Sequence, residues 1–402
     1  MPWKTTHTMD LRNEFALKSL RTSNFRELCR EYGISAKTGY KWQKRFLAHG
    51  FAGLGDESRK PHAHPASLEE ETICRIVKLK NAHPHWGPRK IRALYERRHG
   101  SAGLPGESSF KRVLERCGLT DKRILRPVSD ASRRISSGRK ADAPNEIWTV
   151  DFKGWWKDRE GLRVEPITIR DEYSRMLLDV RILESSRTEA VRACFERLFE
   201  LHGLPGAIRS DNGSPFASVQ GLLGLTRLSA WWLALGIGLE RSRPAHPQDN
   251  GAHERMHRDI RRELQAGRIG RDQAAFDLWR AQYNLERPHE ALGMKTPGEV
   301  YRPSERPWKG TPEDLGYGSM ETRRVTEVSG TIRYQRAQIG ISAALGGWSV
   351  GLSPHEADDG LLDVWFAELL LGQLDPSTAS FHAARPGRME AGESKPESTD
   401  KV

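Results

Sequence analysis

The chain has 402 residues, a formal net charge of +11 at pH 7 and four cysteines, none of them in a CxxC pair. These numbers exclude a small disulfide scaffold and a zinc ribbon, and they predict several domains, a reducing compartment and a polyanionic partner, foremost nucleic acid. No apolar run of about 18 residues occurs, so we expect a cytoplasmic protein with no membrane partner.

The first domain, expected at residues 1–59, has the signs of a helix-turn-helix. Asn24 and Ser35 are suited to cap two successive helices, and Gly33 supplies the turn between them. The second of these helices is expected at residues 36–48.

That second helix is expected to turn one face inward and to present a polar face to DNA. The inward residues are Trp42, Phe46 and Leu47, and the outward ones are Lys37, Thr38, Lys41 and Lys44. A small helical bundle with a solvated lysine face is the alternative interpretation.

A second helical DNA-binding module is expected at residues 60–125. It combines an amphipathic helix at 68–80, a turn at Trp86-Gly87-Pro88 that enters another helix, and a last helix at 110–117. The candidate caps of the last helix are Ser108 and Ser109, and its candidate DNA contacts are Lys111 and Arg112.

A basic linker is expected at residues 126–143. Arg133 and Arg134 lie in it and are expected to follow DNA phosphates. An ordinary solvated linker is the alternative.

From residue 144 to 310 strands alternate with helices, which predicts an α/β core with a mixed sheet. The expected strands are 147–152, 164–170, 176–182, 207–210 and 238–241, and the expected helices are 188–201, 226–235 and one that begins near Asn250.

Short strands punctuated by glycines follow, and they predict a small C-terminal β-barrel or sandwich at residues 318–382. The expected strands are 324–328, 331–336, 348–352 and 361–367. Residues 383–402 have the composition of a disordered tail.

Three acidic residues stand in distinctive settings within the α/β region. Asp151 lies in an apolar strand, Asp211 directly follows the strand at 207–210, and Glu254 lies where a loop becomes a helix. Magnesium prefers oxygen ligands, and phosphodiester chemistry often uses two such ions. We therefore expect the three carboxylates to meet at one site. Taken singly, Asp211 is also a turn signal, and Glu254 is also a first-turn carboxylate favoured by the helix dipole.

Four motifs resemble those of the integrase-core transposases of bacterial insertion sequences, which carry a DDE triad on a ribonuclease H-like fold. The motifs are Trp148-Thr149-Val150-Asp151-Phe152, Ser210-Asp211-Asn212-Gly213-Ser214-Pro215-Phe216, the run from Arg243 to Arg255, and Tyr283-Asn284-x-x-Arg287-Pro288-His289-x-x-Leu292 with the following Thr296-Pro297. With the helix-turn-helix, the resemblance covers about residues 10–305.

The resemblance implies that Asp151, Asp211 and Glu254 are catalytic residues and ligands of two Mg²⁺ or Mn²⁺ ions per active site. The implied activity is DNA transposition, in which the inverted-repeat ends of an element are bound and cleaved and the freed 3′-hydroxyl is joined to target DNA. The residues expected to position phosphates near the metals are Asn212, His253, His257, Arg258 and Arg261, with Lys153 in support.

The same resemblance implies double-stranded DNA as partner, both as element ends and as target. Because two ends must be held together, we expect a homo-oligomer, a dimer or larger, on DNA. We expect it in the bacterial cytoplasm, associated with the nucleoid when bound to DNA.

One departure from that family is the long interval between Asp211 and Glu254, where the extra length falls in the apolar stretch 221–232. We expect this insert to add core packing, with contact to a partner subunit as the alternative.

The long interval leaves Asp249 and Glu240 as competitors for the third carboxylate, while Asp171 is expected to support the site rather than to bind metal. Two other functions stay open, a catalytically inactive DNA-binding regulator and a metal nuclease that only hydrolyses DNA.

Overall fold

The computed structural model describes residues 7–57, 68–120, 139–185, 187–242, 251–356 and 358–384. They belong to two compact units, Met1–Glu69 and Glu70–Val402. No helix within these ranges is long and apolar enough to cross a membrane. The expected phosphate contacts Arg133 and Arg134, with most of the linker and the tail, lie outside the described residues.

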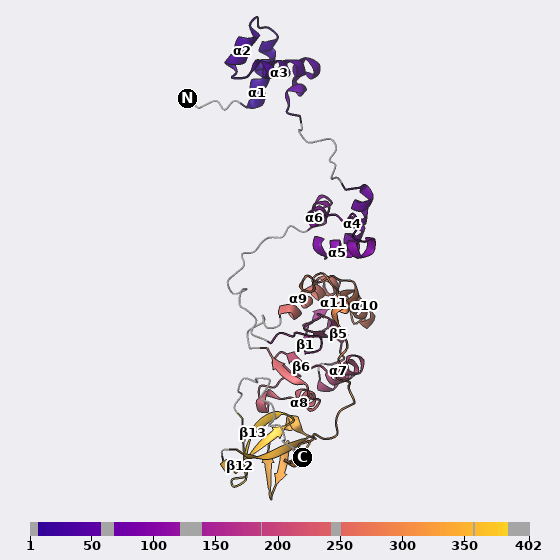
Figure 1. Cartoon of the computed structure of the whole chain (residues 1–402), viewed down its shortest axis with the longest axis vertical. Helices are drawn as coiled ribbons and strands as arrows, with labels where there is room; N and C mark the ends of the chain where they lie inside the picture. Colours follow the sequence, from indigo (N-terminus) through magenta and orange to yellow (C-terminus); the bar gives the residue numbers. More distant parts are fainter. Residues whose placement is uncertain are drawn as a thin grey trace, which may run out of the picture. The chain divides into compact units, whose positions relative to one another are not determined.

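The first unit is a helix-turn-helix of α1 (Thr8–Ser19), α2 (Phe25–Glu31) and α3 (Ala36–His49), followed by the short 3₁₀-helix η1 (Gly50–Leu54) (Figure 1). Both expected caps are confirmed, because the Asn24 side chain accepts from Glu27 N and the Ser35 side chain accepts from Thr38 N. Gly33 has φ +63° at the turn. Trp42 is buried as predicted, whereas Leu47 is 67% exposed, so its placement in the core was wrong.

The second unit begins with three helices, α4 (Glu70–Ala82), α5 (Pro88–His99) and α6 (Glu107–Arg116). They enclose a small core in which Ile76, Leu94 and Phe110 are buried. The prediction that Ser108 or Ser109 caps the last helix was wrong. The helix begins at Glu107, and its N-cap is Gly106, which makes no side-chain bond.

A mixed sheet of five strands in the order β5-β4-β1-β6-β7 forms the centre of the second unit. The strands are β1 (Ile147–Phe152), β4 (Pro166–Asp171), β5 (Leu177–Ile182), β6 (Ala207–Ser210) and β7 (Gly238–Arg241). β1 pairs antiparallel with β4 and parallel with β6. The combination of parallel and antiparallel pairs confirms the expected mixed sheet, and β2 (Trp156–Lys157) and β3 (Arg163–Val164) form a separate two-stranded ribbon.

Helices cover both faces of this sheet. On one face α7 (Thr188–His202) and α8 (Arg227–Ala234) bury Phe199 and Trp232 against the strands. On the other face lie α9 (Gly251–Ile260) and α10 (Gln273–Leu285), with Met256 and Phe276 in the core. A π-helical turn, η5 (Arg261–Gln265), continues α9.

Helix α10 was absent from the sequence-based expectations. Its signal is Asp272, whose side chain caps Ala274 N and Ala275 N. After α10 the chain makes the 3₁₀-helix η6 (Glu290–Leu292) and the short helix α11 (Pro297–Val300).

The apolar insert packs inside the chain, as predicted. It forms the 3₁₀-helix η3 (Leu222–Gly224) and most of α8, and Leu225 joins a second core beneath the C-terminal sheet. Thr226 caps α8 through the backbone of Ser229. The insert thus ties the α/β core to the C-terminal strands.

The C-terminal region is an antiparallel sheet in the order β14-β13-β12-β11-β8, with a separate ribbon of β9 and β10 (Figure 1). Its elements are β8 (Glu321–Arg324), β9 (Thr331–Tyr334), β10 (Ala337–Gly340), the 3₁₀-helix η7 (Ala343–Leu345), β11 (Ser349–His355), β12 (Asp358–Phe366), β13 (Leu369–Asp375) and β14 (Ser380–Ala383). The expected closed barrel is not confirmed, because β14 and β8 are open edges of this ladder in the described residues.

Candidate active site

Asp151 lies near the end of the central strand β1. It stands opposite Thr168 in the β1–β4 ladder, and the Thr168 hydroxyl donates to the Asp151 carbonyl oxygen at 2.9 Å. Its side chain is 33% exposed. The flanking Val150 is fully buried, so the carboxylate sits where the buried strand first meets solvent.

Asp211 is the first residue after β6, the strand that runs parallel to β1 on its other side. The carboxyl ends of neighbouring parallel strands meet at one edge of a sheet, which brings Asp211 beside Asp151. Its Oδ1 accepts from Gly213 N at 3.1 Å, so Asp211 takes part in the turn that the sequence indicates.

Glu254 lies in the first turn of α9, with its side chain exposed. The same helix buries His253 and Met256 against the sheet. Burial of these neighbours fixes the helix while Glu254 stays available at its surface.

The charges of the other two carboxylates act on Asp151. Burial is the largest cause, and together with the negative charges of Asp211 and Glu254 it raises the pKa of Asp151 to about 7, against a backbone hydrogen bond from Phe152 and the positive charge of Lys153. Three carboxylates this close repel one another unless a cation lies among them. Their oxygen atoms are the donor set that a hard divalent ion prefers, so the residues present fit such an ion.

A buried polar cluster supports this edge of the sheet. His253 is fully buried, with its Nδ1 2.9 Å from Thr149 Oγ1 and its Nε2 2.6 Å from Thr168 Oγ1. The Nε2 of His257 also reaches Thr168 Oγ1, at 2.8 Å. A hydroxyl offers one donor and two acceptor sites, so Thr168 can donate to Asp151 and accept from both imidazoles. The cluster therefore joins β1, β4 and α9.

Asp151, His253 and His257 also form a group with ligand atoms within 4.8 Å of one another. A metal held by this group would have to displace one of the two hydroxyl contacts of His253. Both histidines thus already have hydrogen-bond partners within the cluster.

His257 was expected to position phosphate. Burial lowers its pKa to about 3, with added repulsion from Lys153, Arg170 and Arg261, so its ring is neutral. Contact with a phosphate would be a hydrogen bond rather than an ion pair.

The other expected DNA contacts are spread over both units. Lys37, Lys41 and Lys44 are exposed on α3, and the Thr38 hydroxyl contacts Ser35. Lys111 and Arg112 are exposed on α6, where Lys111 lies 3.8 Å from Glu115 and Arg112 bonds Ser108. Arg258 and Arg261 are exposed on the helix that carries Glu254, and Asn212 donates to Ser242 O at 2.8 Å.

The other acidic residues considered near the site, Glu240, Asp171 and Asp249, have different surroundings. Glu240 on β7 is held by Arg209 at 2.6 Å and by Arg139 at 3.2 Å. Asp171 is fully buried and accepts from Asn145 N and Ser174 N, which is the supporting role expected for it. Asp249 lies outside the described residues.

Thr149 and Thr168 escaped the sequence-based reasoning. A signal existed, since Thr149 and Asp151 are two residues apart on one strand and therefore share a face of the sheet. Only the β1–β4 register, however, brings Thr168 to the same place.

Three segments of the chain match known protein domains. Residues 141–247 and 235–297 match the integrase core domain, and residues 38–114 match a homeodomain-like domain. Residues 141–297 of the chain are thus similar to integrase cores. These matches, together with the relatives below, confirm the resemblance to insertion-sequence transposases of the retroviral integrase-like superfamily.

Among the relatives of this integrase core is the insertion element IS407 uncharacterized 31.7 kDa protein of Burkholderia multivorans, 26% identical over 59% of the chain and 83% of the relative. Another is the insertion element IS476 uncharacterized 39.2 kDa protein of Xanthomonas euvesicatoria, 23% identical over 62% of the chain and 69% of the relative. The catalytic core domain of BIV integrase aligns with 39% of the chain and 93% of its own length, at 23% identity and a TM-score of 0.31.

Proposed function

We propose that the chain is a DNA transposase that binds the inverted-repeat ends of an insertion element, cleaves them and joins the 3′-hydroxyl to target DNA. What supports this proposal is the position of Asp151 and Asp211 at the ends of the neighbouring parallel strands β1 and β6, with Glu254 in the first turn of α9 and its charge acting on Asp151. The helix-turn-helix and the basic charge of the chain agree with DNA as substrate.

In this proposal Asp151, Asp211 and Glu254 would hold two Mg²⁺ or Mn²⁺ ions. When bound, such ions supply activation of the attacking oxygen and stabilisation of the leaving oxygen in phosphodiester transfer. The chain's own contribution is to fix the three carboxylates on separate rigid elements. The buried Thr168 cluster prevents β4 and α9 from shifting relative to β1.

The exposed arginines of α9 and η5 would bind the phosphates of the reacting strand. Arg258 and Arg261 lie one and two helical turns beyond Glu254, on its exposed face. They bring positive charge to a site that carries three carboxylates, which a polyanionic substrate needs. Asn212, His257 and Lys153 would complete this contact.

Recognition of the element ends is assigned to α3, with its lysines, and to Lys111 and Arg112 of α6. The linker arginines Arg133 and Arg134 would follow the DNA backbone between them. Two ends must be paired, so the active assembly would be a dimer or larger. The C-terminal sheet is a further DNA-binding or assembly module in this account.

A strand-transfer assay tests the activity. A labelled element-end duplex, supercoiled plasmid and Mg²⁺ are mixed with the chain, and a scrambled duplex serves as control. We expect joined product from the element end alone. Nicked DNA without joined product would favour a hydrolytic nuclease, and tight end binding without any cleavage would favour an inactive regulator.

A further inference from the structure

The fourth motif, which includes Tyr283, Asn284, Arg287 and His289, has no place in the mechanism so far. Its residues close α10 and begin the loop after it. Asn284 is buried and bonds both backbone groups of Leu177 at 2.9 and 2.8 Å, which fastens α10 to β5. Asn284 thus has a structural role, whereas Arg287 faces the other way, toward α9.

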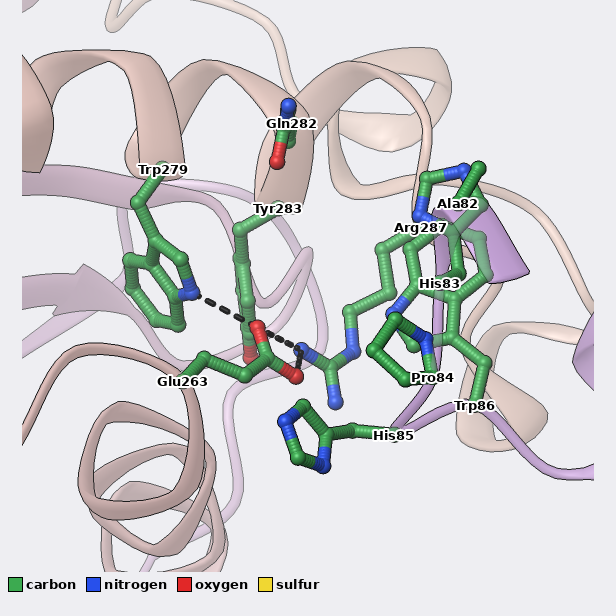
Figure 2. A pocket seen from close by; sticks show the side chains of 10 residues that line it. All are labelled: Ala82, His83, Pro84, His85, Trp86, Glu263, Trp279, Gln282, Tyr283 and Arg287. Carbon is green, nitrogen blue, oxygen red and sulfur yellow. Dashed lines mark hydrogen bonds and ion pairs between the residues drawn. The ribbon is translucent and has the colours of Figure 1, made fainter. Parts of the chain in front are cut away.

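Arg287 is only 4% exposed, yet it contacts three separate parts of the second unit. Its guanidinium lies 2.9 Å from Asp259 on α9 and 3.1 Å from Glu263 on η5. Figure 2 shows Glu263 between Arg287 and the Trp279 indole, which donates to it at 2.7 Å. One fork-shaped cation therefore fixes two successive turns of the helix that begins with Glu254.

Arg287 also meets the helical module of residues 68–120. Its guanidinium carbon lies 5.9 Å from the centre of the Trp86 ring, and Trp86 is 4% exposed and stacked on His83. Together with Tyr283 these side chains line a cavity of about 280 Å³ between the module and α10 (Figure 2). A cation beside an aromatic ring is an attractive contact that strengthens when water is excluded.

Complementary charges hold the module on this side of the core. Arg98 pairs with Glu286, Arg97 with Glu299 at 2.7 Å, and Arg89 approaches Glu290 at 3.8 Å. The three arginines all belong to α5, and the three glutamates follow α10 or lie at its end. The module therefore docks with Trp86 against Arg287 rather than moving as a free arm.

We propose that Arg287 is a positioning residue which couples the helical module to the third carboxylate. With Trp86 docked, Arg287 holds Asp259 and Glu263, and α9 keeps Glu254 in place for the cation. Asp259 lies only about 7.5 Å along the helix axis from Glu254, so a shift at Arg287 reaches the carboxylate through a rigid element. This inference rests on the proposed function.

The test compares Arg287→Lys, Trp86→Leu and Arg280→Lys in the full chain. Arg280 is the matched control, because it also lies on α10 but donates to Leu178 O of β5 and pairs with Asp277 of its own helix. Mn²⁺ affinity is measured by calorimetry without DNA, and hydrogen exchange follows the amides of α9. Strand transfer is then titrated with Mg²⁺.

We expect about tenfold weaker Mn²⁺ binding for Arg287→Lys, as for other groups that orient a metal ligand. Trp86→Leu should weaken it about fivefold, a typical coupling between two sites. In both variants the amides of α9 should exchange hydrogen faster, and strand transfer should recover at high Mg²⁺ concentration. Arg280→Lys should behave like the parent chain in each measurement.

Unchanged Mn²⁺ affinity in both Arg287→Lys and Trp86→Leu overturns the inference. If Arg287→Lys does not fold, Trp86→Leu decides, since Trp86 lies outside the α/β core. Asp151→Asn serves as the reference for the proposed function. If Asp151→Asn binds Mn²⁺ and joins DNA like the parent chain, the proposed function fails. If Asp151→Asn loses Mn²⁺ binding and joining while Trp86→Leu and Arg287→Lys behave like the parent chain, only the coupling through Arg287 is refuted.

Discussion

At the scale of single residues, the site combines crowded negative charge with a neutral buried support. The pKa of Asp151 is raised, and the hydrogen bonds of His253 with Thr149 and Thr168 hold β1, β4 and α9 together. The three carboxylates and the hydroxyl–imidazole cluster are neighbours at the end of one strand, and each predicts a different response to substitution.

Removal of the His253 imidazole should destabilise the fold. His253→Ala removes one hydrogen bond from each of the Thr149 and Thr168 hydroxyls and opens a cavity, so we expect a loss of about 2–4 kcal/mol. Urea unfolding measures this loss. Arg258→Ala, on the exposed face of the same helix, should change stability by less than about 0.5 kcal/mol. Equal effects of the two changes would show that the cluster is not a support.

Divalent cations should stabilise the chain more at pH 8 than at pH 6. The folded pKa of Asp151, about 7, is above its ordinary value of 3.8, so its ionised form costs stability as pH rises through 7. At pH 6 a proton competes with the cation and weakens its affinity about tenfold. Thermal unfolding with and without Mn²⁺ measures the difference, and Asp151→Asn should abolish it. The same Mn²⁺ shift at both pH values would contradict this assignment.

At the scale of elements, strands with one strong local signal were predicted best. β1, β6 and β7 have the predicted bounds, because each is a short segment with apolar residues next to clear turn or loop residues. Boundaries set by neighbours were predicted less well, as at α6, where Gly106 rather than a serine precedes the helix. β13 and β14 were missed, because their pairing with β12 decides their structure.

In the candidate site, too, features with a local sequence signal were predicted and features that depend on packing were not. The carboxylates could be found from motifs, each on its own element. The Thr168 contacts and the Arg287 contacts could not, because they depend on the register of β1 with β4 and on the packing of α10 against α9.

The close approach of α2 and α3 makes Gly39 a sensitive position in the helix-turn-helix. A Cβ at Gly39 would lie 2.4 Å from Cys29 Sγ, so Gly39→Ala should cost about 1–3 kcal/mol through overpacking. Thermal unfolding and amide exchange in α2 and α3 measure the effect. Gly55→Ala, where the nearest atom lies at 3.6 Å, is the control and should have little effect. Normal stability of Gly39→Ala would contradict the described helix crossing.

At the scale of the whole molecule, stability should fall as the solution becomes weakly acidic. Burial lowers the pKa of His202 to about 4 and that of His257 and His289 to about 3, from an ordinary value of 6.5. Below pH 6.5 these imidazoles bind protons in the unfolded chain but stay neutral in the folded chain. These three imidazoles outweigh Asp151, whose proton is held in the folded chain near pH 7. The free energy of unfolding should therefore decline from pH 6.5 to pH 5.

Urea unfolding at several pH values measures that decline. His202→Gln removes one of the three groups and should make the decline shallower. A free energy of unfolding that stays constant or rises between pH 6.5 and pH 5 would contradict the neutral, buried state of these histidines.

The most direct test of the central claim removes one carboxylate charge at a time. Asp151→Asn, Asp211→Asn and Glu254→Gln are compared with Glu240→Gln in end binding and in strand transfer with Mg²⁺. The account predicts that the first three bind the element end but lose joining by at least about a hundredfold, whereas Glu240→Gln still joins. Joining that survives in any of the three, or that fails only in Glu240→Gln, would contradict it.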